Sequence, residues 1–145
     1  MVSVSGLGQI DDFERPAQST LEPGIKSEFE FTVEGMLVTD VGGTIAASVL
    51  STPGMVAVIE RTCTVLALGH LPEGKATVGF EICIKHVAGA LEGARCTVHA
   101  TLREILDGRK LRFEVEVREG NRTIGVGTHE RRVIDIAAHA QSAGR

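Results

Sequence analysis

The chain has 145 residues, 43% of them hydrophobic and 23% charged, a composition that is ordinary for one globular domain. A net charge of -4, few aromatic residues and the lack of tryptophan and tyrosine argue against nucleic acid as a partner. The longest apolar stretch, residues 55–68, is broken by Glu60 and Arg61 and is shorter than the about 20 residues that span a bilayer, so we expect no membrane association.

The N-terminus and the cysteines together predict a cytoplasmic protein. Residues 1–24 mix glycine, serine, proline and acidic residues without periodicity, and their first part lacks the basic and apolar regions of a secretion signal. Three cysteines are an odd number without the spacing of a disulfide framework, which suits a reducing compartment. We expect residues 1–24 to form a flexible arm.

The folded part is expected to begin with a strand and a long loop. Apolar and polar residues alternate from Ile25 to Glu34, which is the period of a half-buried strand. Residues 35–50 show no sustained pattern. An irregular segment of this length inside a compact domain is often a functional loop or lid.

Residues 51–70 predict one buried helix. Apolar residues lie on almost every side of it, whereas a surface helix keeps them to one stripe. Thr52 before Pro53 is typical of an N-cap followed by proline at the first helical position, and Gly69 marks the end. This helix should lie in the middle of the protein, which leaves the carboxylate of Glu60 in a costly apolar setting.

Four further strands, joined mostly by tight turns, are predicted after the helix. Alternation marks them at residues 77–86, 95–103, 111–118 and 123–136. In the first of them one face carries Val78, Phe80, Ile82, Ile84 and His86. This order of elements predicts an α+β fold in which an antiparallel sheet wraps around one long central helix. The open sheet edges favour pairing with a second copy, and residues 137–145 are expected to fray as a tail.

Three side chains are candidates for chemistry, each with a structural alternative. Glu60 suits acid–base work, yet it can also face solvent or pair with an arginine. His86 closes the apolar face of its strand, where it can act as a base or an orienter, although a single histidine there is more often a satisfied core residue. Thr52 can help to hold an oxyanion beside the helix N-terminus or can merely cap the helix. The other four histidines, His129 among them, lack such a placement.

A zinc site is disfavoured although four residues have ligand-like spacing. Cys83 is three residues before His86, and Cys96 is three residues before His99. Residues three apart on a strand point to opposite faces, so neither pair closes on one metal without a bulge. We expect no metal.

Three segments of the sequence carry a pattern that points to a family. They are Ser51-Thr52-Pro53-Gly54-Met55 with Glu60 eight residues beyond the threonine, Thr77-Val78-Gly79 with His86, and Gly127-Thr128-His129-Glu130-Arg131. Together they resemble the hot dog-fold acyl-CoA thioesterases of the fluoroacetyl-CoA thioesterase type, over residues 25–136. The resemblance implies a hot dog fold for this range.

The resemblance also implies a set of roles. Thr52, Glu60 and His86 correspond to the catalytic residues of the family, with Glu60 expected to face His86, and Gly79 and Arg131 correspond to substrate-binding residues, Arg131 toward coenzyme A. The family implies a homodimer whose sheets join edge to edge and whose active sites lie at the interface. The partner is an acyl-CoA substrate, and no cofactor is expected because coenzyme A is part of that substrate.

One departure from the family bears on the acyl group. The fluoroacetyl-CoA enzyme carries a phenylalanine gate before its threonine, and the aligned residue here is Ala46, in a loop without an aromatic residue. We therefore expect hydrolysis of a different acyl-CoA, with a small to medium acyl group. The alternatives are a protein that binds acyl-CoA or an apolar ligand without turnover, and a hydratase or dehydratase on the same fold.

Overall fold

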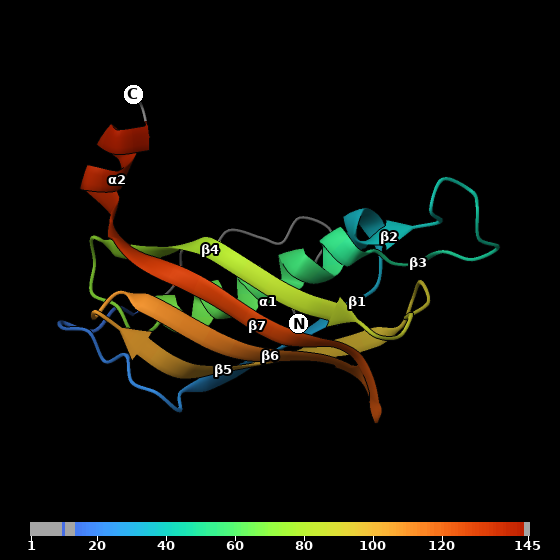
Figure 1. Ribbon diagram of the computed structural model, residues 1–145, viewed down its shortest axis with the longest axis horizontal. Coiled ribbons are helices and arrows are strands. Elements are labelled where there is room, and N and C mark those ends of the chain that lie inside the picture. The colour runs from blue at the N-terminus through green and yellow to red at the C-terminus, as the bar shows by residue number, and fades with distance from the viewer. Residues whose placement is uncertain (1–9, 11–13, 144–145) are drawn as a thin grey trace.

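One antiparallel sheet wraps around one long helix in the computed structural model, which describes residue 10 and residues 14–143 (Figure 1). The elements in chain order are β1 (Lys26–Thr32), the 3-10 turn η2 (Gly35–Leu37), β2 (Val38–Thr39), β3 (Val49–Leu50), α1 (Thr52–Leu68), β4 (Lys75–His86), β5 (Arg95–Leu106), β6 (Lys110–Glu119), β7 (Arg122–Asp135) and α2 (Ile136–Ala143). The sheet has the order β1-β5-β6-β7-β4, so β1 and β4 are its edges. The predicted α+β architecture is confirmed.

Helix α1 begins at a serine cap rather than at the predicted threonine cap. The Ser51 hydroxyl accepts a hydrogen bond from the backbone N–H of Gly54 at 2.9 Å, and Pro53 lies in the first turn. Thr52 is the first helical residue, so the prediction that it caps the helix is wrong. The consequence is functional, because the Thr52 hydroxyl remains available for another partner.

The apolar side of α1 packs into the concave face of the sheet. The buried helix residues include Met55, Val58, Ile59, Cys63 and Leu66. The buried sheet residues that meet them include Phe31, Val98, Leu102, Leu111, Phe113 and Val117. This core fixes the helix relative to the strands that carry the other site residues.

Within the described residues, no helix has the length and apolar character needed to cross a membrane.

Strand β4 does not alternate as its sequence predicts. Its pairing with β7 shifts register between Gly79 and Glu81, so Phe80 is an extra residue in a β-bulge. A bulge reverses the side-chain phase, which is why Thr77 before it and Ile82 after it both face the core, while Phe80 is 59% exposed. The prediction that Phe80 lies on the apolar face is therefore wrong, whereas Ile82 and Ile84 do pack against the core.

The segments that flank the predicted domain are more structured than expected. The backbone N–H of Thr20 donates to His70 and that of Gly24 donates to Leu102, both at 2.8 Å, so part of the predicted arm lies along the domain. The rest of that arm, residues 1–9 and 11–13, lies outside the described residues. Where a frayed tail was predicted, α2 forms, with Asp135 accepting from the N–H of Ala138 at its start.

The pairing of β4 with β7 leaves no room for a side chain at Gly127. A Cβ there would overlap the carbonyl oxygen of Cys83 and lie 2.7 Å from the Cα of Ile84. Gly127→Ala should therefore lower the free energy of unfolding, measured by urea denaturation, by about 1–3 kcal/mol. Gly89→Ala is the matched control, since its Cβ meets no atom within 4 Å. Equal losses in the two variants would contradict this assignment.

Candidate active site

The first turn of α1 and the end of β4 bring Thr52 and His86 together. The Thr52 Oγ1 and His86 Nδ1 atoms are 2.9 Å apart, within hydrogen-bonding distance. The other ring nitrogen of His86, Nε2, is buried and has no hydrogen-bond partner among the described residues. His86 faces the helix, as predicted. A hydroxyl next to a histidine at a helix N-terminus is an arrangement suited to proton transfer near a developing oxyanion.

Glu60 lies about two turns further along α1, above the bulge of β4. Its side chain is 44% exposed, so the predicted apolar setting is only partial. A Cβ at Gly79 would lie 2.9 Å from Glu60 Oε2, which explains why this floor position is glycine. Glu60 opens onto a cavity of about 240 Å³ whose lining also includes Gly79, Ile82 and His129.

A buried arginine supports the carboxylate from the sheet. Arg131 is 5% exposed, and its Nη1 is 3.7 Å from Glu60 Oε2. Its other nitrogens donate to Thr77, with Nε 2.8 Å from Oγ1 and Nη2 3.0 Å from the carbonyl oxygen. Burial lowers the pKa of Arg131, and the negative charge of Glu60 opposes this shift. Arg131 thus contacts both Glu60 and Thr77 of the sheet, and so helps to hold Glu60 in place. Its predicted role in coenzyme A binding stays a prediction.

His129 is a site residue that the sequence analysis missed. It is 2% exposed, with Nε2 3.2 Å from Arg131 Nη1 and Nδ1 2.8 Å from the carbonyl oxygen of Glu81. A guanidinium only donates and a carbonyl only accepts, so this geometry requires a neutral imidazole with its proton on Nδ1. Burial lowers the pKa of His129, which favours the same neutral form. Strand alternation could have identified His129, because it places residues 129 and 131 on one face.

Within one chain the two halves of the predicted catalytic set are separated. Glu60 faces Arg131 and His129, and the expectation that it faces His86 is wrong for a single copy. Glu60 is eight residues beyond Thr52 in the helix, which places their Cα atoms about 12 Å apart along the axis. This distance is far beyond hydrogen-bond reach, so a single copy holds the catalytic set in two parts.

The cysteines of the described residues are free thiols rather than metal ligands or disulfides. Cys63 and Cys96 are buried, and Cys83 is exposed. Burial raises the pKa of Cys63, which lies below Glu60, to about 12, so this thiol stays neutral. Among residues 10 and 14–143, no group of three or more histidine, cysteine, aspartate or glutamate residues is placed to hold a metal ion.

Comparison with known proteins decides the family. A family model described as fluoroacetyl-CoA-specific thioesterase, FlK, matches residues 33–137, a range that includes every site residue described above. The chain belongs to the FlK family. It is 38% identical over 88 residues to the fluoroacetyl-CoA thioesterase of Streptantibioticus cattleyicolor, covering 61% of this chain and 63% of that enzyme. The alignment thus spans less than two thirds of the length of that curated relative.

Solved structures confirm the predicted hot dog fold. The structure of the fluoroacetyl-CoA thioesterase FlK aligns with a TM-score of 0.77 and 27% identity over 86% of this chain and 96% of its own. A hot-dog-like protein from Thermanaerovibrio acidaminovorans aligns with a TM-score of 0.76 over 83% of this chain and 89% of its own, at 17% identity. The fold of these solved structures, like that of this chain, is therefore the one expected for the FlK family.

The neutral state of His129 predicts a pH dependence of stability. A histidine whose pKa is depressed on folding binds fewer protons in the native than in the unfolded state, so stability falls as pH drops below about 6.5. One proton accounts for at most about 1.4 kcal/mol per pH unit. His129→Gln keeps a donor and an acceptor but cannot titrate. Urea denaturation at pH 7.5 and 5.5 should show a smaller stability loss in this variant than in the wild type, and equal losses would contradict the neutral buried imidazole.

Proposed function

We propose that this protein hydrolyses an acyl-CoA thioester to a carboxylate and free coenzyme A. The observation that carries the proposal is the Thr52–His86 hydrogen bond at the N-terminus of α1. The Thr52 hydroxyl and the positive end of the α1 dipole position the thioester and hold negative charge on its carbonyl oxygen. Membership of the FlK family supports the same chemistry.

Glu60 supplies the reactive carboxylate in this proposal. It either attacks the carbonyl carbon, forming an anhydride that water then cleaves, or accepts a proton from the water that attacks. Either route breaks the C–S bond, and His86 assists the proton transfer that releases coenzyme A as a thiol. Arg131 and His129 keep the Glu60 carboxylate oriented over Gly79.

The active enzyme is a homodimer in this proposal. β4 is an edge strand with one unpaired side, and an edge of this kind pairs readily with a second copy. In an antiparallel pair around a two-fold axis, an axis near Ile82 and Cys83 sets Gly79 of each copy opposite His86 of the other. Glu60 above Gly79 then approaches the Thr52–His86 pair of the second copy. This arrangement resolves the separation found within one chain.

The acyl group in the proposal is small to medium and not restricted to fluoroacetate. The segment before Thr52 carries Ala46 where the family enzyme has its aromatic gate. The same segment exposes Met36, Val41 and Ile45, whose apolar side chains suit an apolar acyl chain. Val41 and Ile45 lie in the loop between β2 and β3, which projects beyond the start of α1 in Figure 1.

The free cysteines are consistent with a cytoplasmic setting.

A panel of acyl-CoA substrates of increasing chain length, assayed for free thiol, tests this function. Thiol release is expected for small and medium acyl groups; hydration gives product without thiol, and a binding protein gives neither. Glu60→Gln is expected to lower kcat about 10²–10⁴-fold, the usual contribution of an acid–base group. Glu73→Gln, in the exposed turn before β4, is the control and should be fully active. Full turnover in the Thr52→Ala, Glu60→Gln and His86→Ala variants would contradict the assignment.

A further inference from the structure

The bulge at Phe80 is what gives the Glu60 site its floor. Gly79 immediately before it lies under Glu60 Oε2, and the carbonyl of Glu81 immediately after it bonds His129 Nδ1. The extra residue at Phe80 lets Gly79 before it and Ile82 after it both face the helix, because residues three apart in a regular strand point to opposite faces. The position of the bulge therefore sets the geometry of the site.

Phe80 itself is held from the opposite face of the sheet. Its ring is 59% exposed on an edge strand, and the guanidinium carbon of Arg132 lies 3.6 Å from the ring centroid. This is a cation–π contact between β4 and β7, the two strands whose pairing the bulge interrupts. Arg132 thus covers the extra residue of the bulge.

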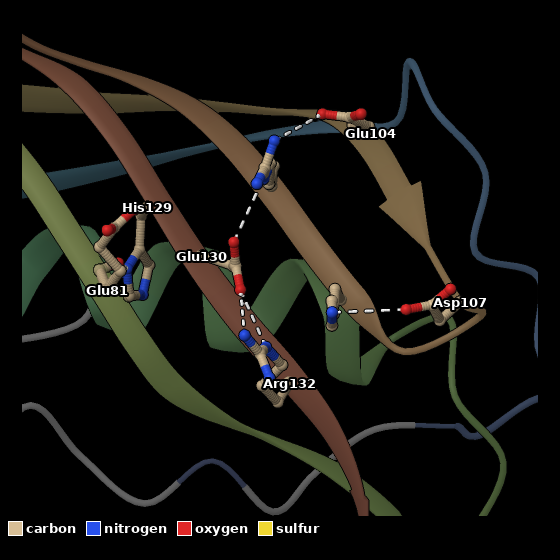
Figure 2. A network of polar contacts seen from close by, with 8 residues as sticks. Glu81, Glu104, Asp107, His129, Glu130 and Arg132 are labelled. Carbon is tan, nitrogen blue, oxygen red and sulfur yellow. Dashed lines mark hydrogen bonds and ion pairs between the residues drawn. The ribbon is translucent and has the colours of Figure 1, made fainter.

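Arg132 is held in turn by a buried carboxylate. Glu130 is 6% exposed on the outer face, and its Oε2 accepts from Arg132 Nε at 2.8 Å and lies 2.7 Å from Arg132 Nη2. Its Oε1 accepts from Arg112 Nε at 3.1 Å, and Arg112 Nη1 is 3.3 Å from Glu104. Figure 2 shows this row of charges passing from Arg132 through Glu130 to Glu104 on β5. Hydrogen bonds from Arg132 and Arg112 lower the pKa of Glu130, so it stays ionised.

We propose that Phe80, Arg132 and Glu130 form a clamp on the outer face that fixes the bulge of β4 and thereby positions Glu60 and His129 on the inner face. These three are positioning residues, since none of them touches the proposed substrate carbonyl. The inference rests on the proposed hydrolase function for its kinetic consequence, whereas the clamp itself is a statement about the bulge.

The clamp differs from an ordinary surface ion pair in what its loss does. Phe80 is exposed, and Arg112 remains paired with Glu130 when Arg132 is replaced, so removing the clamp should leave the protein folded. A displacement of about 1 Å in a catalytic group can cost about 10²-fold in rate. We therefore expect kcat to fall in clamp variants while the free energy of unfolding changes little. KM should change less than kcat, because Thr52 and the N-terminus of α1 are untouched.

Phe80→Ala and Arg132→Ala test the clamp, with Arg103→Ala as the matched control. Arg103 donates to Glu114 at 2.7 Å on the same outer face but on β5 and β6, away from the bulge. We expect kcat for the hydrolysed acyl-CoA to fall at least about 10-fold in both clamp variants, with KM within about 2-fold. Phe80→Tyr keeps the ring face and should keep wild-type kcat, and Arg103→Ala should behave as wild type.

A second readout needs no substrate. The nitrogen-15 NMR signal of the His129 Nδ1–H group, which reports its bond to the Glu81 carbonyl, should shift or broaden in both clamp variants and not in Arg103→Ala. An unchanged His129 signal in the clamp variants overturns the clamp, even if no acyl-CoA is hydrolysed by any form of the protein. Light scattering gives a further test, because loss of the dimer in Phe80→Ala alone would identify Phe80 as an interface residue and overturn the clamp.

Discussion

Arg131 carries its charge into the space between the sheet and α1, where an isolated cation would be unstable. Every neighbour that stabilises it is also part of the site: Thr77 accepts two of its hydrogen bonds, His129 accepts a third, and Glu60 supplies the opposite charge. Because these partners come from β4, β7 and α1, the arginine ties the helix to the sheet at the point where Glu60 emerges. The position of Glu60 is therefore a consequence of satisfying one buried charge.

This constraint explains two otherwise unrelated features. The floor below Glu60 is glycine, since a methyl group there would meet the carboxylate. The strand that supplies it is bulged, since only a change of phase lets Gly79 face the helix while Ile82 and Ile84 also face the core. The bulge makes the edge strand irregular. On the outer face, Phe80 of β4 and the charged row on β7, β6 and β5 together span four strands.

Much of the architecture follows from the sequence because periodicity reports burial directly. Continuous apolarity identified α1, and alternation identified the strands of the large sheet. The bulge escaped detection because Phe80 is apolar and fits an unbroken alternation, although its neighbours require a shift. The cap was assigned to Thr52 because this residue directly precedes Pro53, whereas the Ser51–Gly54 bond shows that Ser51 is the cap. His129 was passed over because the sequence does not show that the strand face it shares with Arg131 lies below Glu60.

In the proposed dimer, each catalytic centre combines Glu60 of one copy with Thr52 and His86 of the other. The most direct test of this arrangement is a mixed dimer of a Glu60→Gln copy and a His86→Ala copy, purified through two different tags, with each parent dimer nearly inactive. We expect recovery of about half the wild-type rate, because one of the two sites then contains only intact residues. A mixed dimer of verified mass that is no more active than its parents would contradict it.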